Sequence, residues 1–132
     1  MTLLITPIYA GLLGLLFLQL SFKAINKRTA NKIGIGTGEN IELLRAVRVH
    51  ANFAEYTPLI LLMLAFAEIN GLPAASIHGM GVLLLVGRVM HALGLSKEPD
   101  IVPLRFTGMI LTFLSLLGTS LACLYVGFGF LN

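Results

Sequence analysis

Polar side chains recur between residues 45 and 58, directly ahead of the apolar run Leu59–Leu64. A helix through this segment, at about 100° per residue, places five of them within about 100° of its surface: Arg45, Arg48, Asn52, Glu55 and Tyr56. His50 points about 140° away from Arg45. Ionisable groups in a membrane-length segment are costly and usually face a protein interior or a water-filled cavity. A single polar face with both signs of charge therefore indicates a binding site for a zwitterionic ligand.

The composition defines the class of protein. Of 132 residues, 57% are hydrophobic and 11% are charged, and the mean hydropathy is +0.92. These values predict one integral membrane domain over residues 1–132. The net charge of +3 comes from clustered basic residues and does not indicate nucleic acid as a partner. Cys123 is the only cysteine, which excludes an intrachain disulfide and a cysteine metal site, so no metal is expected.

Four long apolar segments predict an all-α, integral membrane four-helix bundle with up-down-up-down topology. The helices are expected at about residues 2–22, 41–69, 73–95 and 103–130. Basic residues follow the first segment rather than precede it, so we expect a retained helix and not a cleaved signal peptide. The glycines between residues 34 and 38 lack a following lysine-serine pair and are expected to form a flexible connector. Asn40 or Glu39 is the expected N-cap of the second helix.

The basic residues also predict the orientation. All nine Lys and Arg residues fall toward the same ends of the predicted helices, and the positive-inside rule places these ends in the cytoplasm and both termini outside. Arg88 and His91 lie near the end of the third helix, and Arg105 lies in the first turn of the fourth. Anchoring of single arginines to lipid headgroups remains an alternative for Arg88 and Arg105. It does not explain the polar face of the second helix.

The pattern Arg45-x-x-Arg48-x-x-x-Asn52-x-x-Glu55-Tyr56-x-Pro58 resembles the signature of the MAPEG family, the membrane-associated proteins in eicosanoid and glutathione metabolism. Two later segments are similar to those of its small bacterial members: Gly87-Arg88-Val89-Met90-His91-x-x-Gly94 and Arg105-x-x-Gly108-Met109. The resemblance covers nearly the whole chain. It implies a homotrimer in a bacterial inner membrane, with glutathione bound between neighbouring subunits and open to the cytoplasmic side.

The resemblance also implies residue roles. Arg105 is expected to stabilise the thiolate of glutathione, the thiol co-substrate, while a lipophilic second substrate arrives from the lipid. The tripeptide itself is expected to contact Arg45, Arg48, Asn52, Glu55, Tyr56, Arg88 and His91. The chemistry agrees with these roles, because arginines suit two carboxylates and a carboxylate suits an ammonium group. Glu55 is the one carboxylate that we expect deep in the second helix. A fixed cation beside a thiol favours the nucleophilic thiolate.

Three functions remain open at this point. The family includes glutathione transferases and peroxidases that act on lipophilic electrophiles, and also members without known enzymatic activity. Family enzymes often carry an aromatic hydroxyl at the position of Leu95, and some carry a hydroxyl at the position of Phe106, but this chain has neither. The alternative is therefore a non-catalytic glutathione- or lipid-binding membrane trimer. A small four-helix exporter is the third. Such transporters usually carry an essential carboxylate in the first helix, and residues 2–22 contain none.

Overall fold

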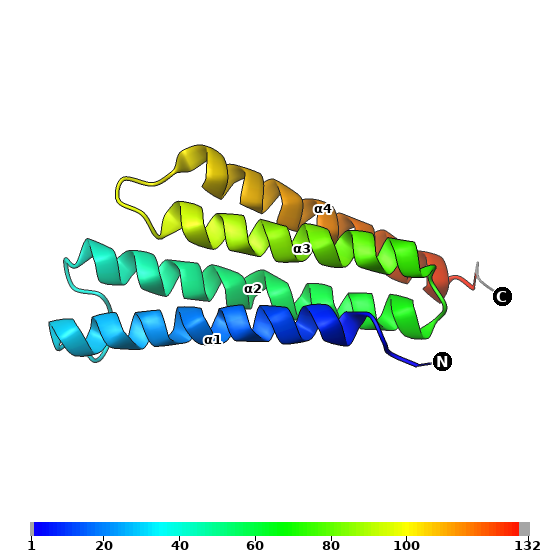
Figure 1. Cartoon of the computed structure of the whole chain (residues 1–132), viewed down its shortest axis with the longest axis horizontal. Coiled ribbons are helices and arrows are strands. Elements are labelled where there is room, and N and C mark those ends of the chain that lie inside the picture. The colour runs from blue at the N-terminus through cyan, green and yellow to red at the C-terminus, as the bar shows by residue number, and fades with distance from the viewer. Residues whose placement is uncertain (1, 130–132) are drawn as a thin grey trace.

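The computed structural model describes residues 2–129, and this part of the chain forms four long helices. They are α1 (Thr6–Asn31), α2 (Ile41–Ile69), α3 (Ala74–Leu95) and α4 (Val102–Gly127). The helices alternate in direction, so that the α1–α2 and α3–α4 loops lie at one end of the molecule and both chain ends lie at the other (Figure 1). Each helix is long and apolar enough to cross a membrane. The predicted all-α membrane bundle is confirmed.

Side-chain exposure follows from this membrane setting. The core between α1, α2 and α3 contains fully buried leucines and isoleucines, such as Leu13, Ile60 and Leu84. Large apolar side chains also point outward, among them Leu15 at 68% and Phe106 at 66% exposure. In water such a surface would aggregate, whereas in a bilayer it is solvated by lipid tails.

The helix bounds agree with the sequence to within a residue except in α1 and at the end of α4. Asn40 caps α2, since its Oδ1 accepts a hydrogen bond from the Leu43 amide at 2.7 Å. The first helix was expected at residues 2–22, but it begins at Thr6 and continues to Asn31. Hydropathy shows only the part of a helix that lies in the hydrocarbon core of the membrane. The helix itself can continue into the headgroup region, where lysine and arginine side chains reach water. The fourth helix was expected to continue to residue 130, which lies outside the described residues, but α4 already ends at Gly127, with Phe128 as its C-cap.

Helices α3 and α4 pack almost backbone to backbone. A Cβ atom added to Gly94 would lie 2.4 Å from the Arg105 amide nitrogen, and one added to Gly108 would lie 2.4 Å from the His91 nitrogen. The buried face of α4 consists of small residues at three- and four-residue spacing: Gly108, Thr112, Ser115, Thr119 and Ala122. Small interface residues permit this close approach in membranes. The packing fixes the first turn of α4 against the last turns of α3.

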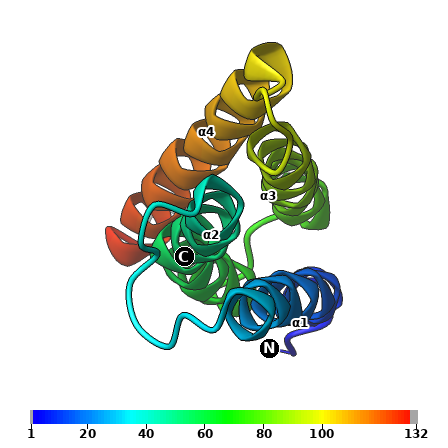
Figure 2. The ribbon, with the colours of Figure 1, turned by 90° about the vertical axis from the view of Figure 1, so that its left-hand side faces the viewer.

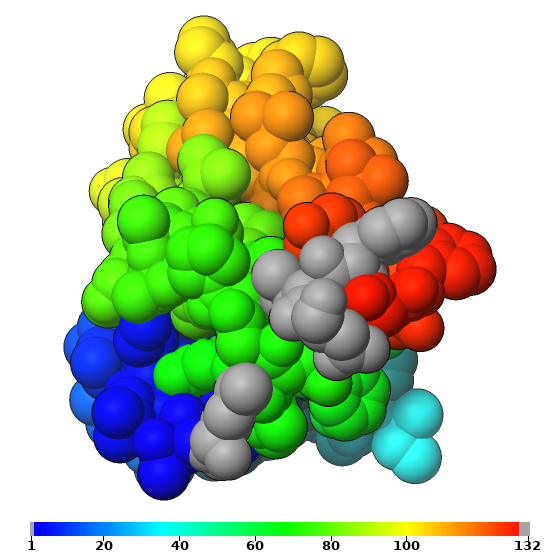
Figure 3. Space-filling model, turned by 90° about the vertical axis from the view of Figure 1, so that its right-hand side faces the viewer, coloured from blue at the N-terminus to red at the C-terminus, as the bar shows by residue number. Residues whose placement is uncertain are grey.

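At the opposite end, Glu68 holds the N-terminus of α1. Its carboxylate accepts hydrogen bonds from the amides of Leu4, Ile5 and Thr6 at 2.6–2.7 Å, and the blue N-terminal segment lies beside the green end of α2 in Figure 3. α1 has no N-cap side chain of its own, so Glu68 satisfies amides that a helix start leaves free. The sequence analysis expected Glu55 to be the one carboxylate deep in α2. Glu55 lies in the middle of α2 and Glu68 in its last turn, yet Glu68 is the more buried of the two: it is 9% exposed, whereas the Glu55 side chain is 50% exposed.

Candidate functional site

A cleft opens between α2, α3 and α4 toward the end that carries the basic residues, the end viewed in Figure 2. Its volume is about 370 Å³, within the range of small-molecule sites. The lining residues come from all three helices: Arg48, Asn52, His91, Leu95, Arg105 and Met109. Because the face predicted on α2 lies opposite the polar residues of α3 and α4, the fold brings together groups that are far apart in the sequence.

Arg48 and Glu55 form a loose pair on the α2 side of the cleft. Arg48 Nη1 lies 3.9 Å from Glu55 Oε1, and the two side chains are 54% and 50% exposed. An exposed pair at this distance contributes little to stability. The pair can therefore open, so that Arg48 could bind a ligand carboxylate and Glu55 a ligand ammonium group.

Arg88 and His91 form the buried wall behind the cleft. Arg88 is 1% exposed, and its Nη2 donates to Asn52 Oδ1 at 2.8 Å. Within residues 2–129, Arg88 Nε and Nη1 have no hydrogen-bond partner, and neither does His91 Nε2. A buried donor without a partner is unfavourable. This wall thus holds unused hydrogen-bonding capacity for a ligand or a bound water.

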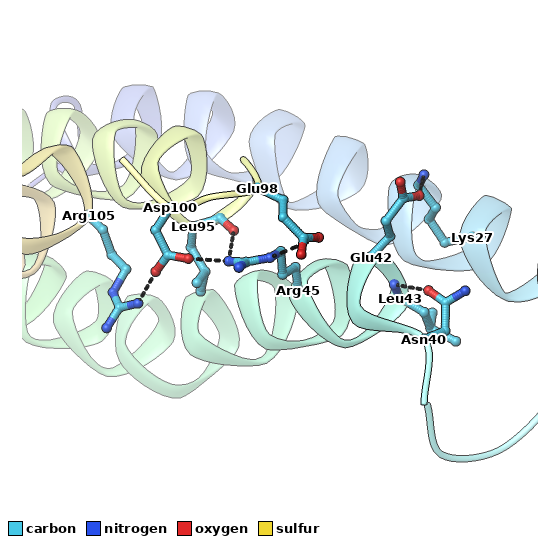
Figure 4. Close-up of polar contacts among 9 residues, drawn as sticks. All are labelled: Lys27, Asn40, Glu42, Leu43, Arg45, Leu95, Glu98, Asp100 and Arg105. Atoms are coloured by element: carbon cyan, nitrogen blue, oxygen red, sulfur yellow. Dashed lines mark hydrogen bonds and ion pairs between the residues drawn. The ribbon is translucent and has the colours of Figure 1, made fainter. Parts of the chain in front are cut away.

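Arg45 and Arg105 share one carboxylate, that of Asp100 in the α3–α4 loop. Arg45 Nη1 donates to Asp100 Oδ1, and Arg105 Nη1 donates to Oδ2 (Figure 4). Arg45 also lies 3.7 Å from Glu98 and donates to the Leu95 carbonyl at 3.4 Å. The hydrogen bond from Arg45, and then that from Arg105, lowers the pKa of the Asp100 carboxyl from its usual 3.8. Asp100 thus ties the start of α2 to the start of α4.

The predicted site residues fall into three groups. Those that line the cleft are Arg48, Asn52, His91 and Arg105. Two more contact a lining residue, Glu55 through Arg48 and Arg88 through Asn52. Arg45 and Tyr56 do not line it, because loop carboxylates hold Arg45 and the Tyr56 ring packs edge-on against Phe113 at 5.6 Å. Sequence reasoning missed Asp100, whose only signal was its position between two arginine-bearing helices.

The fold and this basic cleft define a membrane protein of known family: the chain belongs to the MAPEG family, whose model matches residues 6–125. Among individual proteins, it is similar to the inner membrane protein YecN of Escherichia coli strain K12 and to the protein of the same name in E. coli O6:H1 (strain CFT073). Each is 34% identical over 122 residues, which cover 92% of this chain and 92% of the relative. The family resemblance seen in the sequence is confirmed, and these relatives are named as inner membrane proteins.

Proposed function

We propose that this chain binds glutathione in the cleft between α2, α3 and α4, and that it uses the thiol to conjugate or reduce lipophilic electrophiles. The reaction class would be that of a microsomal-type glutathione transferase or peroxidase. Glutathione offers two carboxylates, an ammonium group and a thiol. Arg48, Arg105 and Glu55 offer the complementary charges, and Asn52 offers an amide.

One observation supports this proposal more than any other: arginines from two helices line one cleft in a membrane span, and the carboxylate of Glu55 lies beside one of them. Headgroup anchoring needs cations alone and needs no cleft. The apolar outward face beside Arg105, including Phe106, would admit a lipophilic substrate from the bilayer.

Calorimetry with glutathione on detergent-purified protein tests the binding step. Glu55→Gln is expected to weaken glutathione binding by about 2–4 kcal/mol because the ligand ammonium loses its counter-ion. Its melting temperature should stay near that of the wild type, since the pair with Arg48 is exposed. Lys32→Gln is the matched control, with one charge changed at the same end and outside the cleft. Wild-type affinity in Glu55→Gln would remove Glu55 from the site, and no binding by the wild type would refute the proposal.

The non-catalytic alternative also has an observation in its favour. Asp100 already neutralises Arg105, and neither Leu95 nor Phe106 supplies a hydroxyl beside it. A protein of this kind would bind glutathione without lowering the pKa of its thiol. A thiol-conjugation assay with an aryl halide separates the two functions, because the alternative predicts binding without turnover.

We further propose that the protein is a homotrimer in a bacterial inner membrane, with the cleft open to the cytoplasm. The support is the family, the half-exposed Arg48 and Glu55, which a neighbouring subunit would help to enclose, and the concentration of basic residues at one end. A detergent-corrected mass of three 14.2 kDa chains is the expected result.

A further inference from the structure

A second hollow lies at the basic end of the bundle, between α1 and α3. In Figure 2, α1 lies at the lower right with α3 above it, and α4 packs on the far side of α3. The groove has a volume of about 390 Å³ and shares no lining residue with the cleft. Its apolar walls include Leu16 and Leu20 from α1 and Val89 and Leu93 from α3, while Lys23 and Lys97 stand at its mouth. Gln19 and Ser96 also line it, so it is a largely apolar groove with polar groups and two cations among its lining residues.

The charge at this mouth is not balanced by the protein. Lys23 and Lys97 make no ion pair with any residue in the range 2–129 that the structure describes. Two glutamates line a neighbouring hollow together with these lysines, but each is paired elsewhere, Glu42 with Lys27 and Glu98 with Arg45. Two like charges from separate elements thus converge without a counter-ion. An anion between them would relieve their repulsion.

We propose that this groove binds one anionic glycerophospholipid. The phosphate would lie between Lys23 and Lys97, and one acyl chain would follow the apolar walls into the bilayer. Lysines at helix ends attract anionic lipid in general, at about 1 kcal/mol each. Here the two lysines line the same groove as the apolar side chains. The phosphate of one lipid could therefore pair with the lysines while its acyl chain fills the groove. The occupant is therefore a lipid rather than a free anion.

Tryptophan fluorescence can test the site, because the chain contains no tryptophan. Leu93 is 53% exposed on the groove wall, so Leu93→Trp adds a single reporter at a tolerant position. The protein is reconstituted in vesicles that contain brominated phosphatidylglycerol or brominated phosphatidylcholine. We expect stronger quenching by phosphatidylglycerol, with a relative affinity at least fivefold higher. Lys23→Gln and Lys97→Gln should each lower that preference by about fivefold.

Two controls separate a specific site from diffuse surface charge. Phe106→Trp places the reporter on α4 at a matched depth, since Gly94 lies against Arg105, and it should show no preference. Lys32→Gln removes one charge from the same end outside the groove and should leave the quenching of Trp at position 93 unchanged. Equal quenching by the two lipids at position 93, the same preference at position 106, or an equal effect of Lys32→Gln would each overturn the proposal.

Inorganic phosphate distinguishes a lipid from a free anion. Phosphate and sodium chloride at equal ionic strength should reduce the quenching equally if the occupant is a lipid. Specific competition by phosphate would overturn that assignment. If Leu93→Trp does not insert correctly, the same lysine variants can be compared without it by melting temperature in detergent. Added phosphatidylglycerol should then stabilise the wild type and Lys32→Gln more than Lys23→Gln or Lys97→Gln, and equal stabilisation of all four would refute the site.

Discussion

The two arginines that line the cleft have different counter-ions. Arg105 is paired with Asp100, a loop carboxylate that Arg45 also holds. Among residues 2–129, Arg48 is paired with Glu55 alone, at 3.9 Å, and both side chains are about half exposed. Arg105 also lies in the first turn of α4, where the positive end of the helix adds to its charge. We therefore expect a thiolate to bind beside Arg105 and a peptide carboxylate to displace Glu55 from Arg48.

This difference predicts separate effects for the two arginines. Arg105→Ala should keep glutathione affinity within about tenfold, raise the pKa of the bound thiol and lower turnover by about 100-fold or more. Arg48→Ala should mainly reduce affinity. Thiolate absorbance near 240 nm, titrated against pH for each variant, measures the thiol directly. If Arg105→Ala keeps the wild-type titration while Arg48→Ala loses it, the two roles are reversed.

The polar face of α2 could be predicted from residue spacing, whereas its partners could not. Helical periodicity fixes which side Arg48, Asn52 and Glu55 share. It does not show that Asp100 in a loop would hold Arg45 away from the cleft. Nor does it show that Glu68 would meet amides more than 60 residues earlier in the chain. Both contacts depend on tertiary structure, which a single sequence does not display.

At the scale of elements, Asp100 in the α3–α4 loop connects α2 to α4 through its ion pairs with Arg45 and Arg105. The contribution of these ion pairs to stability should depend on pH. Because the pKa of Asp100 lies below 3.8 in the folded protein, its ion pairs contribute fully above that pH and are lost as the pH falls further. Asp100→Asn should therefore lower the melting temperature at neutral pH, and this deficit should shrink below pH 3.8.

Melting curves of the wild type and Asp100→Asn between pH 7 and about pH 2.5 check this expectation. Glu39→Gln is the control, since this exposed carboxylate makes no ion pair within the described residues. A deficit that stays constant down to the lowest pH would mean that the charge of Asp100 does not contribute.

Glu68 joins α1 to α2 at the other end, and its replacement should be more damaging than that of any exposed carboxylate. Glutamine retains one acceptor oxygen and directs an NH₂ group at amides that also donate. Glu68→Gln is expected to lower the free energy of unfolding by about 2–3 kcal/mol. Unfolding in mixed micelles measures this change, with Glu39→Gln again as the matched control. An effect no larger than that of Glu39→Gln would contradict a capping role.

Element bounds were predictable where local signals exist. α2 begins at its Asn40 cap and α3 starts after a glycine-proline turn, and both agree with the sequence to within a residue. α1 exceeded the expected helix because Lys23, Lys27 and Arg28 are good helix formers that the hydropathy window treats as its end.

At the scale of the whole molecule, we expect the distribution of charge to set the orientation in the membrane. With Cys123 replaced by alanine, a cysteine at Thr37 or Lys97 should react with a membrane-impermeant maleimide only from the cytoplasmic side. A cysteine at Asn70 should react only from outside, because the α2–α3 turn lies at the opposite end (Figure 1). The reverse pattern would place the cleft outside the cell and remove it from the cytoplasmic glutathione pool.

The close contact at Gly94 has a consequence for how variation in this chain is interpreted. Every missense change at this codon adds at least a Cβ atom, and that atom would overlap the backbone of Arg105. A scale based on charge, polarity or volume ranks glycine to alanine among the mildest replacements. Here the change from Gly94 to alanine would displace the start of α4 and, with it, the guanidinium group of Arg105, because the added Cβ atom overlaps the Arg105 backbone. A loss-of-function allele at position 94 would therefore look innocuous in the sequence and act on the cleft as strongly as a change of the arginine itself.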